Sequence, residues 1–136
     1  MSIIAARDGL ATQLNTIAGL RVYELPPEAA PELPAAIILQ GEPFASYGHS
    51  IGAPDVKLLF EALLLVRSGD RGQAWSELEP FLEATGASSI KAAVDGPLGG
   101  SADWARVTKV IKAGPVIHNR ASYWGATFQI EVYQSG

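Results

Sequence analysis

The stretch DVKLLFEALLLVRS, residues 55–68, decides the fold because its side chains alternate regularly between two kinds. One set of alternate positions is wholly apolar: Val56, Leu58, Phe60, Ala62, Leu64 and Val66. A strand turns successive side chains to opposite faces, so this pattern predicts a long strand with one buried face. We expect helices to cover that face.

The opposite face of the same strand is mixed, with charged residues at its ends and Leu59, Leu63 and Leu65 between them. A sheet face that is half apolar needs partial cover. Two explanations stay open at this point: another part of the chain covers the leucines, or a neighbouring subunit does. The three leucines are therefore candidate subunit-interface residues.

The end of the chain repeats the alternation. Residues 123–133 place one apolar set on a single face: Trp124, Ala126, Phe128, Ile130 and Val132. With a strand at 104–113 they predict a hairpin joined by a connection at 114–122. Shorter strands are predicted at 20–24 and 35–40, where β-branched and aromatic residues gather.

Helices are predicted before and between these strands. Residues 3–17 show apolar positions at helical spacing, with Ser2 as a candidate N-cap and Gly19 as a stop. A second helix follows residue 70 and contains Pro80, and a short third helix ends near residue 94, capped by Ser88 or Ser89. The sequence thus predicts one α+β domain, residues 1–136, with a mainly antiparallel sheet and helices packed on one face.

Two loops are candidate docking segments, one at 41–54 and one at 114–122. Ordinary connections are about 4–6 residues long, and longer ones often bind partners. We expect both loops to be mobile in the free protein and to order on docking. Their candidate contact residues are Phe44, Tyr47, His49, His118 and Arg120. The alternative for Phe44 and Tyr47 is that they tuck under their own loop.

Composition narrows the chemistry. The chain has 136 residues, a net charge of −4, two histidines and no cysteine. Disulfides, thiol nucleophiles, cysteine-bound zinc and multi-histidine metal sites are thereby excluded or nearly so. The glycine-rich segment 95–101 lacks the Lys-Ser/Thr ending of a phosphate loop, and no Gly-x-Ser-x-Gly elbow is present. We expect no enzyme activity, catalytic residue, cofactor or metal. No apolar run is long enough to span a membrane.

The C-terminal hairpin is locally basic. Residues 104–130 include Arg106, Lys109, Lys112 and Arg120 and no acidic residue. Strict alternation would put Arg106, Thr108 and Lys112 on one face. Such a face suits an acidic protein or a nucleic-acid backbone, although an ordinary solvated face is the interpretation we favour from sequence.

Several stretches together resemble one family: GLRVY (19–23), PAAIIL (34–39), GASSIKAA (86–93), LGG (98–100) and YWGATFQIEV (123–132). They are similar to the tail-terminator, or tail-completion, proteins of long-tailed bacteriophages, of the minor tail protein U type. The resemblance covers nearly the whole chain, and it implies an α+β fold. The matching positions are turns and core faces rather than catalytic residues.

The resemblance also implies an assembly. It leads us to expect a homo-hexameric ring that caps the tail tube, stops its polymerisation and offers a surface to the head. The implied partners are other copies of the chain, the tail tube protein and a head-completion or neck protein. DNA would pass through the ring without specific binding. The expected location is the head-proximal end of the virion tail, after synthesis in the host cytoplasm, with no membrane contact.

Two other functions stay open. One is a different head–tail connector or neck protein of similar size and assembly logic. The other is a small-molecule-binding α+β regulatory domain that uses a pocket against the sheet. Size in solution and ligand-dependent thermal stabilisation distinguish these functions from the ring.

Overall fold

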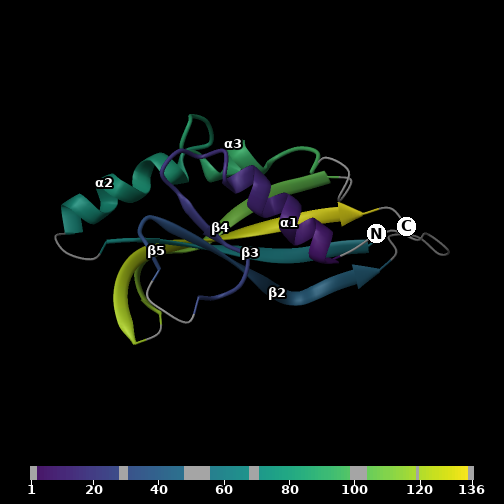
Figure 1. Ribbon diagram of the computed structural model, residues 1–136, viewed down its shortest axis with the longest axis horizontal. Coiled ribbons are helices and arrows are strands. Elements are labelled where there is room, and N and C mark those ends of the chain that lie inside the picture. Colours follow the sequence, from purple (N-terminus) through teal and green to yellow (C-terminus); the bar gives the residue numbers. More distant parts are fainter. Residues whose placement is uncertain are drawn as a thin grey trace.

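The computed structural model describes residues 3–27, 31–47, 56–67, 71–98, 104–118 and 120–134 (Figure 1). Within these ranges, three helices and five strands follow one another in the order α1 (Ile3–Leu14), β1 (Arg21–Tyr23), β2 (Ala35–Tyr47), β3 (Val56–Val66), α2 (Arg71–Leu82), α3 (Ile90–Val94), β4 (Trp104–His118) and β5 (Ala121–Gln134). The predicted α+β class is confirmed. The strands form one sheet in the order β1-β2-β3-β5-β4, parallel between β1 and β2 and antiparallel elsewhere.

The strand predicted from residues 55–68 is the centre of this sheet. β3 pairs with β2 on one side and with β5 on the other, and Phe60 lies opposite Ile130. Its even-numbered residues from Leu58 to Val66 are almost fully buried. A strand flanked on both sides and covered on one face needs this apolar pattern.

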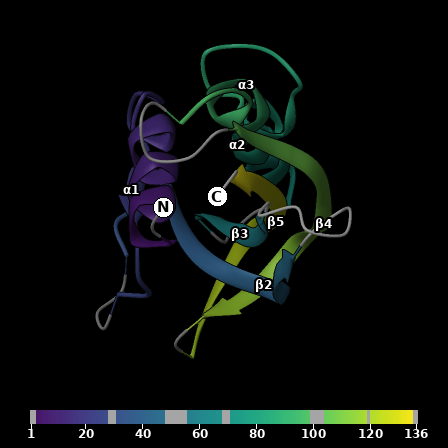
Figure 2. The same ribbon diagram turned by 90° about the vertical axis from the view of Figure 1, so that its right-hand side faces the viewer.

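All three helices gather on one side of the curved sheet (Figures 1 and 2). α1 contacts β1 and β2, α2 contacts β3 and β5, and α3 contacts β4. Their buried side chains, among them Leu10, Leu14 and Leu78, join the even face of β3 and β5 in one large core. The predicted packing of helices on one face is confirmed. We call the opposite side of the sheet the open face.

The helix ends follow the predicted local chemistry. Ser89 is the N-cap of α3, and its hydroxyl accepts a hydrogen bond from the Ala92 amide at 3.0 Å. The same hydroxyl donates to the Glu83 carbonyl, which ties α3 to the turn after α2. Gly19 and Gly86 have positive φ angles of 80° and 113°, in the region that favours glycine after a helix.

Both predicted docking loops are wrong in their extent. Residues 41–47 belong to β2, and residues 114–118 and 121–122 belong to β4 and β5, so these two strands follow each other almost directly along the chain. The reason is pairing: Ala45, Ser46 and Tyr47 supply the partners for the first residues of β3, after a break in register beyond Gln40. If the first residues of β3 were left unpaired on this side, their backbone N–H and C=O groups would lack hydrogen-bond partners. Residues 48–55 lie outside the described part of the chain.

Two predicted core contributions need correction. The helical spacing of Trp75 with Leu78 and Leu82 predicts that it faces the sheet, yet it is 44% exposed and meets Trp124 edge to face at 5.5 Å between ring centroids. Val56 is only half-buried, because it opens β3 at the end of the sheet. The buried residues of α2 are Ala74, Leu78 and Phe81, so the core-facing stripe of this helix leaves out Trp75.

The open face carries a second, smaller cluster. Ile37, Leu65 and Tyr123 are buried there, and Leu63 and Val116 pack against them. Leu65 is 0% exposed within one chain, so it offers no surface to a neighbour and its place among the interface candidates is wrong. The curled end of the β4–β5 hairpin supplies the cover, through Tyr123 and Val116. Leu59 and Leu63 are half-buried, and their interface role stays a prediction.

Candidate functional surfaces

The strand β4 forms one edge of the sheet, and within the described residues only its start is bridged there, by Gly96, which pairs with Ala105. It carries an unusual share of the exposed apolar surface: Val110 is 40% exposed, Ile111 50% and Ile117 79%. Soluble monomers rarely gather large apolar side chains along one open edge, and such edges tend to associate. We name these three residues the β4-side group.

A second exposed apolar set lies on the opposite side of the sheet. Ile3 and Ile4 begin α1, Leu25 follows β1, and Tyr47 ends β2, and all four are exposed. Because α1 rests on β1 and β2, this β2-side group belongs to the edge remote from β4. The remaining exposed large apolar residues in the described part of the chain are Trp75 and Trp104.

The two edges differ in charge as well as in shape. β4 contains three basic residues and no acidic one, whereas β2 contains Glu42 and no basic one. Asp8 and Glu24 add carboxylates on the β2 side, and Arg7 and Arg21 add cations there. A hydrogen bond shared with Asp8, burial and the Asp8 charge raise the pKa of Glu24, against the opposing charge of Arg7. The edges are therefore unlike surfaces: β4 carries only cations, whereas the β2 side carries both signs with an excess of carboxylates.

Two irregularities in β4 rearrange its faces. The pairing with β5 skips Thr108 and then Ile111, so each is an extra residue of a bulge. As a result Arg106, Lys109 and Lys112 pair with Glu131, Gln129 and Thr127, three residues that share the open face. Lys109 thus joins the predicted face of Arg106, Thr108 and Lys112. Thr108 still meets this face, because its hydroxyl accepts a hydrogen bond from the Gln129 side chain and donates one to the Gln129 carbonyl.

Glu131 is the carboxylate at one end of this basic row. The Tyr133 hydroxyl donates a hydrogen bond to it, and Lys57 and Arg106 lie 3.7 and 3.5 Å away. The Tyr133 bond and the two cations hold the pKa of Glu131 below its ordinary value, against the opposing effect of burial. The same bond raises the pKa of Tyr133. Glu131 is therefore a fixed anion shared by two cations.

The residues predicted to dock partners do not form one site. Tyr47 lies at the sheet end where β3 begins, while His118 and Arg120 lie at the other end, beside the hairpin turn. Phe44 is half-buried and stacks edge to face on Phe60 at 5.2 Å, so it belongs to the core. His49 lies outside the described residues. Tyr47 and Arg120 are exposed, and the buried Nε2 atom of His118 has no hydrogen-bond partner among the described residues.

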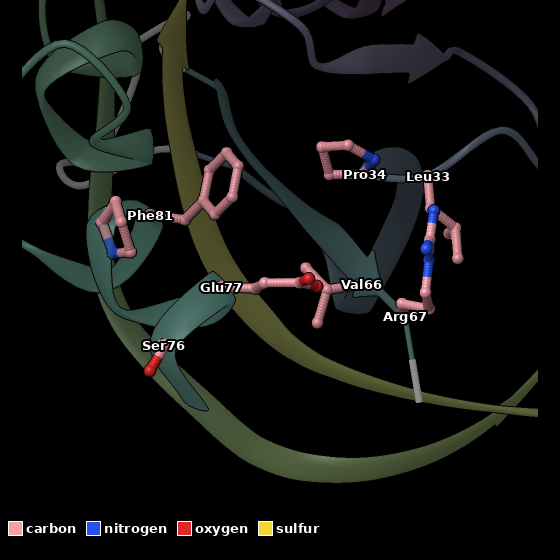
Figure 3. A pocket seen from close by; sticks show the side chains of 8 residues that line it. Leu33, Pro34, Val66, Arg67, Ser76, Glu77 and Phe81 are labelled. Atoms are coloured by element: carbon pink, nitrogen blue, oxygen red, sulfur yellow. The ribbon is translucent and has the colours of Figure 1, made fainter. Parts of the chain in front are cut away.

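A pocket opens between α2 and the end of β3, with a volume of about 300 Å³. Figure 3 shows Val66 and Phe81 on its apolar side, with Glu77 and Arg67 reaching in from different elements. This volume is at the lower limit of small-ligand sites, which run from about 300 to 1,000 Å³. Arg67 and Glu77 form no ion pair with each other at 4 Å, so both charges are available to a polar ligand.

Within the described ranges, no three His, Cys, Asp or Glu side chains gather in a way that would hold a metal ion. None of the described helices is long and apolar enough to cross a membrane. No protein-family model matches the sequence, and no curated protein matches it.

The β4-side group is the feature that the sequence reasoning missed. With strict alternation, Val110 would fall on the same face as Arg106 and Lys112, with Ile111 opposite. The bulges interrupt that alternation. Neither bulged position is a glycine or proline, so the sequence gives no sign of them. The absence of acidic residues from 104 to 118 was the available signal that this strand has a surface role.

Proposed function

We propose that this chain is a tail terminator of a long-tailed bacteriophage, which assembles into a closed ring at the end of the tail tube. The observation that carries the assembly is the split of exposed apolar residues between the two edges of the sheet. The β4-side and β2-side groups are unlike surfaces on opposite sides of one chain. The identity of the ring as a terminator rests on the sequence resemblance, and the number of six copies comes from it alone.

Unlike surfaces on opposite sides produce head-to-tail contacts. Such contacts either close into a ring, if the rotation between copies is right, or continue into an open filament. In a ring, no free edge is left over. A cap needs this closure, because an open filament would keep adding subunits instead of stopping growth.

The contact between copies would be made by side chains rather than by a continued backbone ladder. β4 contains two bulges and Pro115, and β2 contains Pro43 and a register break. Bulges and prolines are the devices that prevent edge-to-edge strand pairing. Docking of apolar groups, steered by the unlike charges of the two edges, remains compatible with them.

The ends of the strands offer a second support. Tyr47 and Arg120 are exposed at opposite ends of the sheet. A terminator must contact the tube on one side and the neck on the other. Surfaces at opposite ends of the strands would serve these two partners separately.

The test is the mass of the particle in solution across a range of protein concentrations, by light scattering or native mass spectrometry. The wild type should form a discrete ring at high concentration or on added tail tubes. The double variant Ile111→Glu, Ile117→Glu should stay monomeric and leave tube ends bare in electron micrographs. The matched control is Gln73→Glu, Ser76→Glu on the exposed side of α2, which should still assemble.

A wild-type chain that stays monomeric at every concentration and fails to decorate tube ends would reject the proposal. The pocket beneath α2 supports the second candidate, a small-molecule-binding domain. If the chain is such a domain, its melting temperature should rise when a ligand is added. The rise should be lost in Phe81→Trp, because the larger side chain fills the pocket.

A further inference from the structure

The bulges of β4 have a consequence for charge that is separate from the apolar edge. They bring Lys109 to the side of the sheet on which Trp104, Arg106 and Lys112 lie. The β5 partners of these four residues are the alternate residues Tyr133, Glu131, Gln129 and Thr127, which share one face. We call these four residues the open-face row. Successive members lie two ladder positions apart, which is about 7 Å along the strand.

The charge of this row is only partly compensated. Arg106 approaches Glu131 at 3.5 Å but shares it with Lys57. Lys109 and Lys112 are exposed and form no ion pair with any described residue. Neighbouring like charges on a sheet repel one another. An acidic protein with a net charge of −4 thus keeps a local row of cations that a polyanion would relieve.

An aromatic side chain stands at the head of the row. Trp104 is 51% exposed and pairs with Tyr133 across the ladder. An exposed tryptophan on an open sheet face is a platform on which a base can stack. A patch that acts only through its charge, or a strand edge protected only by lysines, would not require an exposed tryptophan.

We propose that the open-face row binds nucleic acid without sequence preference, with phosphates on Arg106, Lys109 and Lys112 and an unpaired base stacked on Trp104. Evenly spaced cations follow a phosphate backbone, and stacking on an aromatic ring accepts every base. Gln129 and Thr127 on the neighbouring strand add neutral hydrogen-bonding groups beside the cations. The row needs only one chain, so this inference stands independently of the ring.

The first measurement is the fluorescence anisotropy of a labelled oligo-dT of roughly 16 nucleotides, titrated with the full chain at several salt concentrations. Three phosphate contacts predict a slope of about −2 for the logarithm of affinity against the logarithm of salt concentration. In Lys109→Gln, Lys112→Gln the slope should fall to about −0.7, and affinity at low salt should drop roughly tenfold. Both lysines are exposed, so the variant should fold normally.

The matched control is Arg67→Gln, Arg71→Gln, which removes the same charge after β3 and at the start of α2. Arg67 follows Val66, the partner of Trp124, and so lies beyond Thr127, where the row ends at Lys112. The affinity and slope of this control should stay close to those of the wild type. Trp104→Ala should weaken oligo-dT binding roughly tenfold while leaving a duplex of the same length unaffected, because only an unpaired base can stack.

Three outcomes would overturn the proposal. In the first, the wild type does not bind oligo-dT at low salt. In the second, Lys109→Gln, Lys112→Gln and Arg67→Gln, Arg71→Gln weaken binding equally, which would show that only the net charge matters. In the third outcome, Lys109→Gln, Lys112→Gln abolishes self-association or polyglutamate binding but leaves oligo-dT affinity unchanged. That result would assign the row to a carboxylate-rich protein surface, such as the β2 side of another copy.

Discussion

Gly125 of β5 lies so close to Leu64 of β3 that a Cβ atom at position 125 would overlap the Leu64 carbonyl oxygen. On its other side Gly125 pairs with Gly114 of β4, whose φ angle of 144° few other residues adopt. The β4–β5 hairpin bends away from the helices toward its end (Figure 1). Two facing glycines therefore let three strands approach closely where the sheet curls.

Gly125→Ala should destabilise the protein by about 2 kcal/mol or more, as overpacking against a backbone usually does. Gly41→Ala is the matched comparison. A Cβ there would stand 2.6 Å from Cγ of Leu59, a side chain that can turn away, so the cost should be smaller. Urea unfolding measures both. If Gly125→Ala proves as stable as the wild type, the close approach of β5 to β3 is contradicted.

Phe60→Ala should lower the free energy of unfolding by about 3–5 kcal/mol, because Phe60 is 1% exposed at the centre of the main core. Phe44→Ala should cost less, since Phe44 is only half-buried and touches the core through its edge contact with Phe60. Chemical denaturation of both variants tests the order. A well-tolerated Phe60→Asp would contradict the placement of β3.

The elements with the strongest periodicity were predictable from sequence. β3 and β5 carry apolar residues at nearly every second position, and these apolar faces form the core as expected. Ser89 was also within reach, because a serine before a short apolar run is a typical N-cap. These apolar faces and this N-cap depend on residues that are close together in the sequence, so they can be predicted without knowing the rest of the fold.

Tertiary pairing determines the features that sequence reasoning missed. Residues 41–47 contain glycine and proline and indicate a loop, yet the neighbouring β3 strand draws them into β2. The β4 bulges likewise depend on the curvature of the sheet, and they decide which faces Lys109 and Val110 occupy. The candidate surfaces are therefore determined by the pairing register of the strands, which the sequence does not reveal. The basic composition of β4 can be seen in the sequence alone.

Stability should fall in acid partly through Glu131. Its pKa is lowered in the folded protein by Tyr133, Lys57 and Arg106, so its contribution is fully present above its unfolded pKa of about 4.3. That contribution is lost as the pH falls through the lower, folded pKa. Glu131→Gln should thus destabilise the protein at pH 7 and flatten the loss of stability below about pH 4.

Thermal melts of the wild type and Glu131→Gln from pH 7 to pH 3 measure this pH dependence of stability. The control is Glu79→Gln, which removes an exposed carboxylate of α2 that forms no ion pair with a described residue. It should leave the shape of the curve unchanged. If the Glu131→Gln and wild-type curves run parallel over the whole range, the carboxylate is not the acid-sensitive group.

Mixing two defective variants tests the head-to-tail contact directly. Ile111→Glu, Ile117→Glu spoils the β4 side, and Ile4→Glu, Tyr47→Glu spoils the β2 side; all four positions are exposed, so the chains should fold. Each variant alone should be monomeric. Mixed in equal amounts, they should form a one-to-one dimer and nothing larger, because each supplies the intact surface that the other lacks.

The size of the product distinguishes the possible interfaces. If copies met through like surfaces, β4 side to β4 side, the β2-side variant alone would still associate, and mixing would produce no new complex. Native mass spectrometry resolves the two variants by mass and reports the composition of each complex. A mixed dimer supports unlike surfaces on opposite edges, the arrangement that a ring requires. Association of the β2-side variant by itself would contradict the proposed ring contact.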